Sequence, residues 1–182
     1  MKRLFSLLLI AALAACTGEE NIYREYECYF VFDTSLHPIP CQLTVALGSN
    51  GTFMKIGTQM NKGVRHLNTT RNYDNATEDI KLTTERETQL RYALGANNCI
   101  IVGVSSYDNV LVAYEGQCSN CLKEQGGRKY PLTWKNNGGQ LYCDKCKRTY
   151  DVNNGVVANG TSGIGLYRYK AAFDGTILRV WN

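Results

Sequence analysis

Two closely spaced pairs of cysteines constrain the fold of this 182-residue chain more than any other feature. In each Cys-x-x-Cys pair the chain can curl around an ion so that both sulfurs point inward, and two such pairs make a tetrahedral four-sulfur site. Turn-forming residues at 126–127 and 136–139 favour a hairpin that brings the pairs together. The sequence therefore predicts a metal-binding subdomain at about 115–152. Its predicted ligands are Cys118, Cys121, Cys143 and Cys146.

Three states of these cysteines are consistent with the sequence. Zinc suits a closed set of thiolates and would add its binding energy to folding. Four cysteines can also hold a [2Fe–2S] cluster, which would make the chain an electron carrier. In an exported protein the pairs could instead form disulfides. We expect zinc, with the cluster as its alternative. The site's negative charge would be offset by neighbouring cations, namely Lys123, Lys145, Lys147 and Arg148.

The first fifteen residues have the layout of a secretory signal peptide. Lys2 and Arg3 supply its positive start, and residues 4–13 form an apolar run that is short for a membrane-spanning helix. The run ends in Leu-Ala-Ala-Cys at residues 13–16, which resembles a lipobox. We therefore expect cleavage after residue 15 and lipidation of Cys16, which would tether the protein to a membrane.

Residues 16–27 are polar and are predicted to form the lipidated tether. Thr17, in place of Asp, is similar to the outer-membrane sorting pattern of such lipoproteins. Glu19 and Glu20 resemble the acidic export signal of surface lipoproteins in Bacteroidota, although acids in a tether are also typical of a solvated linker. The expected location is the cell envelope, in the outer membrane.

Residues 28–182 predict a single, mostly β domain, because aromatic and β-branched runs are short and turn signals separate them. Removal of Lys2 and Arg3 with the signal lowers the net charge from +4 to +2, a positive charge too small to indicate nucleic-acid binding. Thr84 and Glu87 have capping-box spacing, so residues 82–94 favour a short helix, with a strand almost as compatible. Residues 58–80 give few signals. Strands are expected at 29–32, 43–47, 52–56, 100–104, 110–114, 165–171 and 176–181.

The remaining cysteines and the histidines are expected to be structural. Cys28 and Cys41 would close a modest disulfide loop if their geometry allows it. Cys99 begins an apolar run and is predicted to be a buried, inert thiol. His37 and His66, the two histidines of the chain, lie far upstream of the four cysteines and are interpreted as surface or structural residues.

The second half of the chain carries a family resemblance. Residues 110–118 read VLVAYEGQC, and residues 141–151 read LYCDKCKRTYD. Together with the strands that follow, they resemble a Rieske domain, whose pattern is Cys-x-His, a hairpin, Cys-x-x-His-Gly-Ser-x-Phe-Asp, Gly-Pro-Ala and paired final strands. Rieske-like lipoproteins of Bacteroidota are the most similar subgroup. The resemblance covers about residues 95–182 and implies an antiparallel β-sandwich with a metal-binding subdomain.

The chain departs from the Rieske pattern at the metal ligands. Cys118 and Cys143 match the family's cysteines, but Asn120 stands where the first histidine belongs and Cys146 replaces the second. Lys and Arg at 147–148 replace the Gly-Ser that packs on the cluster. Thr161 replaces the proline of the covering loop. A cluster with two histidine ligands is therefore not expected.

No catalytic arrangement is legible in the sequence, which lacks a recognisable Ser-His-Asp or Cys-His set and a nucleotide-binding glycine loop. We favour a non-catalytic binding or structural lipoprotein held together by zinc. An electron carrier and a protein that cycles between dithiol and disulfide are the other hypotheses. The sequence names no protein partner. Aromatic residues that could serve a partner surface, or lie half-buried in a sheet, are Tyr23, Tyr26, Tyr167 and Tyr169.

Overall fold

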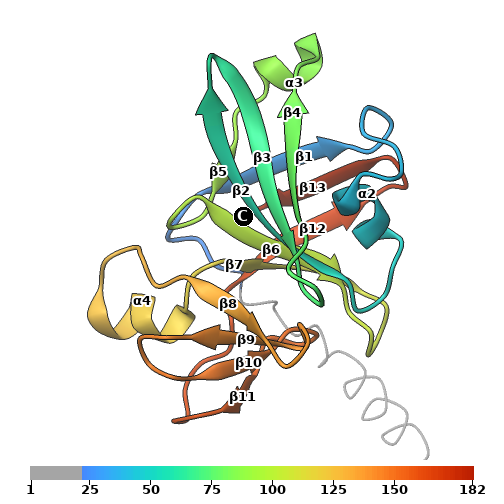
Figure 1. Ribbon diagram of the computed structural model, residues 1–182. Coiled ribbons are helices and arrows are strands. Elements are labelled where there is room, and N and C mark those ends of the chain that lie inside the picture. Colours follow the sequence, from blue (N-terminus) through green and yellow to red (C-terminus); the bar gives the residue numbers. More distant parts are fainter. Residues whose placement is uncertain (1–21) are drawn as a thin grey trace, which may run out of the picture.

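A computed structural model describes residues 22–182 of the chain. The predicted signal peptide, Cys16 and most of the tether lie outside the described residues. All pairs of named strands in the described part are antiparallel, which confirms the predicted fold class (Figure 1). In chain order the elements are β1 (Cys28–Asp33), α2 (Gln42–Leu47), β2 (Phe53–Asn61), β3 (Val64–Arg71), β4 (Thr77–Leu82), α3 (Glu85–Gln89), β5 (Ala93–Leu94), β6 (Cys99–Val104), β7 (Leu111–Glu115), α4 (Ser119–Gln125), β8 (Leu132–Lys135), β9 (Gln140–Cys143), β10 (Thr149–Asp151), β11 (Val157–Asn159), β12 (Arg168–Phe173) and β13 (Ile177–Trp181).

Nine strands form one sheet that curls until its two ends face each other across a hydrophobic core. The strand order is β4-β3-β2-β6-β7-β12-β13-β1-β5. Phe30 of β1 and Val180 of β13 enter this core from one side, and Met54 and Ile56 of β2 enter it from the other. All four side chains are fully buried. The two halves of the sheet therefore pack as a sandwich.

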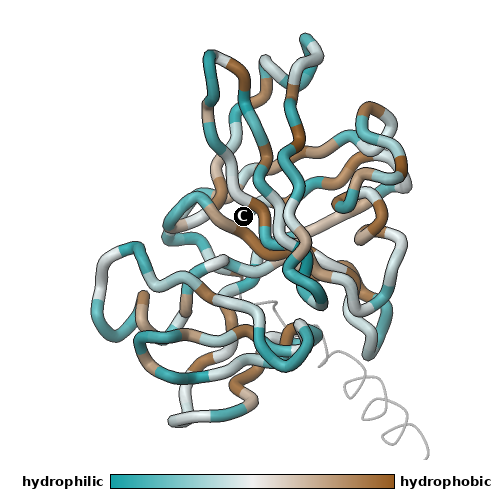
Figure 2. The backbone as a smooth tube through the Cα atoms, in the orientation of Figure 1, coloured by the Kyte–Doolittle hydropathy of each residue, from teal (hydrophilic) through white to brown (hydrophobic). Residues whose placement is uncertain are grey.

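The central strands β6 and β7 and the first half of β2 are buried on both faces. Ile100 and Val102 of β6 point into the sandwich core, whereas Ile101 between them belongs to a second core on the opposite side. Successive side chains of a strand point to opposite faces, so an unbroken apolar run fits a strand that is covered on both sides. Figure 2 shows β6 as a nearly continuous hydrophobic stretch.

A small four-stranded sheet, in the order β11-β10-β9-β8, covers the second face of the central strands. It is inserted in the chain between β7 and β12, and it lies below the larger sheet in Figure 1. Leu132 and Tyr150 of the small sheet share the second core with Phe53 and Tyr114 of the large sheet. This second core also contains three of the four paired cysteines, so the insertion is the part that carries the predicted metal site.

The strand expected at residues 43–47 is wrong, because this segment forms helix α2. Its buried residues are Leu43, Ala46 and Leu47, whose spacing places them on one face of a helix. A short apolar run fits both periodicities, and here tertiary packing decides in favour of the helix. In α3 the predicted capping box is confirmed: the Thr84 side chain accepts from the Glu87 N–H, and the Glu87 carboxylate accepts from the Thr84 N–H at 3.0 Å.

The polar segment at 58–80 forms the second half of β2, whose first half the sequence predicted at 52–56, together with β3 and most of β4, which the sequence did not indicate. β2 and β3 pair over eight residues from Met54–Arg71 to Asn61–Val64, and β4 continues the ladder on β3. These strands extend beyond the core at one end of the molecule (Figure 1), so their outer faces need no hydrophobic alternation. The later hairpins, β6–β7 and β12–β13, lie where the sequence predicted them.

Residues 22–27, assigned to the tether from the sequence, pack on the domain. Ile22 forms a bridge to Arg168, and the Tyr23 N–H donates to the Arg168 carbonyl at 2.8 Å. The Tyr23 ring stacks on Tyr167 with the ring centroids 3.8 Å apart. Asn182 fastens the same segment, because its side-chain amide donates to the carbonyls of Tyr23 and Tyr26. The contacts of Tyr23 with Tyr26 and Tyr167 thus hold this segment on the domain.

The structure does not join Cys28 to Cys41, since both thiols are buried and free. Cys28 begins β1, and Cys41 precedes α2 beyond the far end of that strand. A strand of this length spans about 17 Å, which explains why the two residues stay apart. Cys99 was predicted to be buried and is only partly so, but desolvation raises its pKa to about 12, so the thiol stays protonated at neutral pH.

Both histidines have structural partners. His37 Nε2 lies 2.6 Å from Glu87 Oε1, which links the segment before α2 to α3. His66 Nδ1 lies 2.7 Å from Asp79 Oδ1 across the β3–β4 ladder. Within residues 22–182, no helix is long and apolar enough to span a membrane.

Replacement of Gly103 by alanine tests the packing of the central strands. A β-carbon at this position of β6 would overlap the Thr52 carbonyl and the Phe53 ring. We expect Gly103→Ala to lower the free energy of unfolding by about 2 kcal/mol, measured by urea denaturation. Gly48→Ala is the control, because its β-carbon would approach only the Val45 carbonyl, at 3.8 Å. Equal stability of the two variants would contradict the two-sided packing.

Candidate metal centre

The four cysteines come from two segments that the small sheet brings together. Cys118 is the N-cap of α4, and Cys121 lies in the first turn of that helix. Cys143 is the last residue of β9, and Cys146 lies in the turn that leads to β10. The first pair is therefore held at the start of a helix, whereas the sequence predicted a Cys-x-x-Cys loop. The second pair occupies a tight β-turn region, as expected.

Backbone hydrogen bonds fix the turn around the second pair. The Lys147 N–H donates to the Cys143 carbonyl at 2.9 Å, and the Cys143 N–H donates to the Arg148 carbonyl at 3.0 Å. Lys147 has a φ of 62°, in the left-handed region that glycine normally occupies. The chain therefore curls tightly enough for Cys143 and Cys146 to face the same point.

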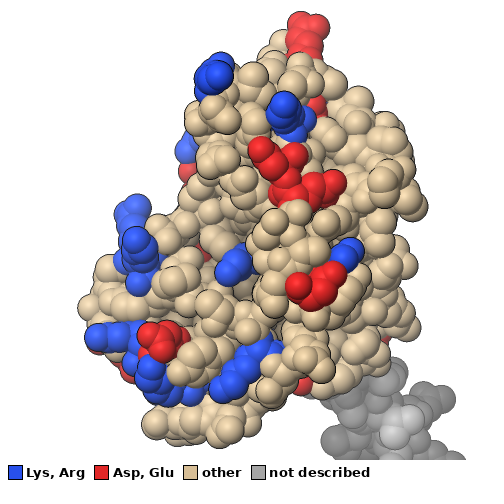
Figure 3. Space-filling view, viewed as in Figure 1, with Lys and Arg blue, Asp and Glu red and all other residues tan. Residues whose placement is uncertain are grey.

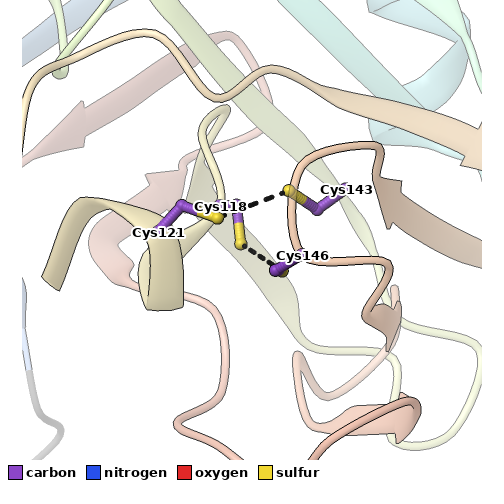
Figure 4. A group of neighbouring side chains, drawn as sticks. All are labelled: Cys118, Cys121, Cys143 and Cys146. Carbon is purple, nitrogen blue, oxygen red and sulfur yellow. Dashed lines mark hydrogen bonds between the residues drawn. The ribbon is translucent and has the colours of Figure 1, made fainter. Parts of the chain in front are cut away.

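The four sulfurs converge on one point in space. All four Sγ atoms lie within 4.8 Å of one another. The shortest contacts cross between the segments: Cys118 Sγ lies 3.5 Å from Cys146 Sγ, and Cys121 Sγ lies 3.7 Å from Cys143 Sγ (Figure 4). A zinc–sulfur bond of about 2.3 Å places tetrahedral sulfurs about 3.8 Å apart. The donor set thus fits a single tetrahedral ion shared by both segments.

The site is closed to solvent on most sides. Cys118 and Cys121 have no exposed surface, Cys143 is 1% exposed, and Cys146 is partly buried. Closed four-ligand sites are typical of structural zinc, whereas catalytic zinc sites keep one coordination position open for water or substrate. The burial of these cysteines is therefore that of a closed four-ligand metal site.

Tyr150 and Asn120 form a polar layer behind the sulfurs. The Asn120 side-chain amide donates to the Tyr150 hydroxyl at 2.8 Å, and this hydroxyl lies 3.1 Å from Cys118 Sγ. Because the hydroxyl accepts from Asn120, its own proton is free to point at the sulfur. Asn120 also donates to the Ile164 carbonyl and accepts from the Ile164 N–H. The loop before β12 is thereby fastened to the metal site.

Arg148 is the buried cation of the site. It is only 6% exposed, and its guanidinium donates to the carbonyls of Thr161 and Ser162 at 2.9 and 3.1 Å. It also lies 3.2 Å from Glu124 Oε1. Its position next to Cys146 would offset part of the negative charge of four thiolates. Lys123, Lys145 and Lys147 are exposed, so screening by water weakens their effect.

Contacts among the thiols lower the pKa of one cysteine and raise the pKa of another. The neighbouring Cys118 thiol stabilises the Cys143 thiolate and lowers the pKa of Cys143 to about 5. The same interaction raises the pKa of Cys118, and burial raises that of Cys121 to about 12. Without metal the site therefore retains thiol protons at neutral pH. These protons would be released when a divalent ion binds.

Sequence reasoning identified the four cysteines but missed the role of Tyr150. In the sequence Tyr150 stands at the Phe position of the Rieske-like pattern, and because Phe has no hydroxyl the pattern does not indicate a contact with Cys118. Asn120 was singled out only as a residue in the place of a histidine, and in the structure it binds the loop at Ile164 and the Tyr150 hydroxyl. Arg148 was predicted to offset charge, and it lies next to the site as expected.

Removal of the Tyr150 hydroxyl tests the polar layer. We expect Tyr150→Phe to weaken zinc binding about 10- to 100-fold, because Cys118 loses a hydrogen bond from outside the ligand shell. Competition with a chromophoric chelator measures the change. Tyr73→Phe makes the same chemical change at an exposed position and should leave the affinity unaltered. An unchanged zinc affinity in Tyr150→Phe would show that the Tyr150 hydroxyl does not support metal binding.

The region that holds the four cysteines is similar to a known protein family. Residues 117–155 match a family model described as Trm112p-like protein. The match includes all four cysteines, α4 and the strands β8–β10, and therefore most of the inserted sheet. A comparison with curated proteins gives no match for the chain. The metal-binding subdomain is thus similar to a Trm112p-like domain with a four-cysteine site.

Proposed function

We propose that this protein is a lipid-anchored, non-catalytic binding or structural module whose four paired cysteines hold a structural zinc ion. The observation that carries the proposal is the convergence of four buried sulfurs within 4.8 Å. The similarity of residues 117–155 to a Trm112p-like domain supports the same conclusion.

The spacing of the sulfurs favours zinc over an iron–sulfur cluster. In a [2Fe–2S] cluster two irons and two sulfides separate one pair of thiolates from the other. Here the two shortest sulfur–sulfur contacts, at 3.5 and 3.7 Å, each join a cysteine of α4 to a cysteine of the β9–β10 turn. All four sulfurs also lie within 4.8 Å of one another, which is the spacing expected around a single ion and therefore favours zinc.

Zinc at this position would stabilise the inserted sheet. The sheet is small, and one of its faces packs on the central strands through a modest set of apolar side chains. A structural zinc ion contributes roughly 10 kcal/mol or more of apparent binding free energy in small domains. The ion would therefore connect α4 to the β9–β10 turn and keep both against β6 and β7.

An electron carrier with a [2Fe–2S] cluster is the second candidate function. It is favoured by the resemblance to Rieske domains, because the four-stranded insertion precedes two paired final strands, β12 and β13, as that resemblance implies. This candidate requires the two cysteine pairs to move apart when the cluster is inserted.

The proposed membrane anchor is supported by the signal layout at 1–15 and the lipobox-like sequence that ends in Cys16. Ile22, the first described residue, packs on the domain six residues after this cysteine. A lipid on Cys16 would therefore hold the domain close to a bilayer, in the cell envelope and in the outer membrane by the sorting pattern.

Metal analysis with a visible absorption spectrum tests the metal. The chain without residues 1–16, purified anaerobically from cells supplied with iron and zinc, should contain about one zinc per chain and be colourless. Cys143→Ser should lose the zinc and unfold at a lower temperature. Cys99→Ser is the control, because it changes a cysteine outside the site. Two irons per chain, acid-labile sulfide and a visible charge-transfer band would contradict zinc and assign the site to a [2Fe–2S] cluster.

Fatty-acid labelling tests the anchor. The full-length chain, expressed in a bacterial host, should incorporate labelled palmitate and fractionate with membranes. Cys16→Ser should abolish both the label and the membrane fractionation, because no acceptor thiol remains at the cleavage site. Labelling that persists in Cys16→Ser, or its absence from the unaltered chain, would refute lipidation of this residue.

A further inference from the structure

Five exposed cations form a surface around α4, which we call the basic face. Lys123 of α4 and Arg24 border a cleft of about 720 Å³ on one side of the helix. Lys129 and Lys145 border a hollow of about 340 Å³ on its other side. Arg128 lies between them in the chain and covers the Tyr26 ring, 4.9 Å from the centroid. Figure 3 shows Lys and Arg side chains gathered over this part of the molecule.

Three of the four acids near the basic face pair with cations outside it, and the fourth, Glu25, borders the same cleft as Arg24 and Lys123. Glu25 accepts from the Tyr23 hydroxyl, Glu27 pairs with Arg91, and Glu124 pairs with Arg148. Asp144 pairs with Lys147 at 2.7 Å. Within residues 22–182, none of the five cations of the basic face forms an ion pair. Their charge therefore remains available to an anionic surface.

Charge is distributed unevenly along the chain. Residues 117–159, which contain α4 and the small sheet, hold seven Lys and Arg against three Asp and Glu. Residues 22–116 hold eight against ten. The positive end of the molecule thus coincides with the metal-binding subdomain, although the cysteines themselves are buried behind it.

The chain enters the domain beside the basic face. Ile22 borders the same cleft as Arg24 and Lys123. Six residue steps connect Cys16 to Ile22, which span at most about 21 Å even when fully extended. A lipid on Cys16 would therefore keep this side of the domain within about 20 Å of the bilayer.

We propose that the basic face lies on anionic lipid headgroups of the membrane that receives the Cys16 lipid, so that the metal-binding subdomain faces the bilayer. This inference rests on the proposed anchor. Each Lys near an anionic bilayer strengthens binding about fivefold, and the attraction decays within a Debye length. The short tether supplies that proximity, and the basic face then fixes the orientation of the domain.

Vesicle binding by the unlipidated protein tests the basic face separately from the anchor. Residues 17–182 include every element of the fold and can be loaded with zinc. Co-sedimentation compares vesicles of phosphatidylcholine alone with vesicles that also contain phosphatidylglycerol. We expect binding to the anionic vesicles only, and we expect it to weaken steeply as the salt concentration rises.

Two double variants with equal charge changes locate the binding surface. Lys123→Glu/Lys129→Glu reverses two cations of the basic face, and Lys62→Glu/Lys81→Glu reverses two exposed cations on β4 and the β2–β3 turn. The first should bind anionic vesicles at least tenfold more weakly, whereas the second should stay within about twofold of the unaltered protein. Equal zinc content confirms that each variant keeps its metal site.

Other results would overturn the inference. If both double variants weakened binding to anionic vesicles equally, the net charge of the protein would explain the binding and the basic face would not. Equal binding to neutral and anionic vesicles would exclude electrostatic recognition of lipid. Binding to a single-stranded oligonucleotide without binding to vesicles would assign the face to a nucleic acid. Failure of palmitate labelling refutes the anchor itself, and it is read in a different experiment from vesicle binding.

Discussion

The rest of the structure depends on the burial of β6, β7 and the first half of β2 from both sides. Their alternating side chains enter two separate cores, and neither core could form alone from the short strands around it. The sandwich core joins these strands to β1 and β13, while the second core joins them to the four-stranded insertion. Ile101 and Tyr114 therefore couple the metal-binding subdomain to the main sheet through ordinary hydrophobic contact, which is non-directional and proportional to buried area.

The four-cysteine site adds a geometric constraint to the hydrophobic contact between the metal-binding subdomain and the main sheet. Apolar packing alone would allow α4 and the β9–β10 turn to shift along the central strands. Four sulfurs from the two segments require one relative position, and Asn120, Tyr150 and Arg148 extend this requirement to the loop at 161–164. The convergent cysteines and the buried hydrogen bonds thus specify the arrangement, whereas the hydrophobic cores supply most of the favourable free energy.

The sequence predicted the parts of this molecule that short-range patterns determine. The cysteine spacing located the four sulfurs, the apolar runs located β6 and β7, and Thr84 with Glu87 located the helix start of α3. It failed where tertiary context decides. Residues 43–47 form a helix because its apolar face packs on the core, and residues 64–80 form strands because β3 pairs on β2 and β4 pairs on β3. Cys28 and Cys41 lie apart because β1 is extended between them, and Tyr150 contacts Cys118 only through the folded sheet.

The attachment of Ile22 to Arg168 determines how a mechanical load would enter the domain. Any tension in the segment that precedes Ile22 passes to β12, which is hydrogen-bonded on one side to β7 and on the other to β13. Because β12 lies inside the sheet, the load is shared between two ladders and acts along them, and the stacked rings of Tyr23 and Tyr167 resist sliding at the point of entry. A pull on an edge strand would instead break its hydrogen bonds one after another. Tension at this point of entry would therefore be carried by both ladders of β12 together.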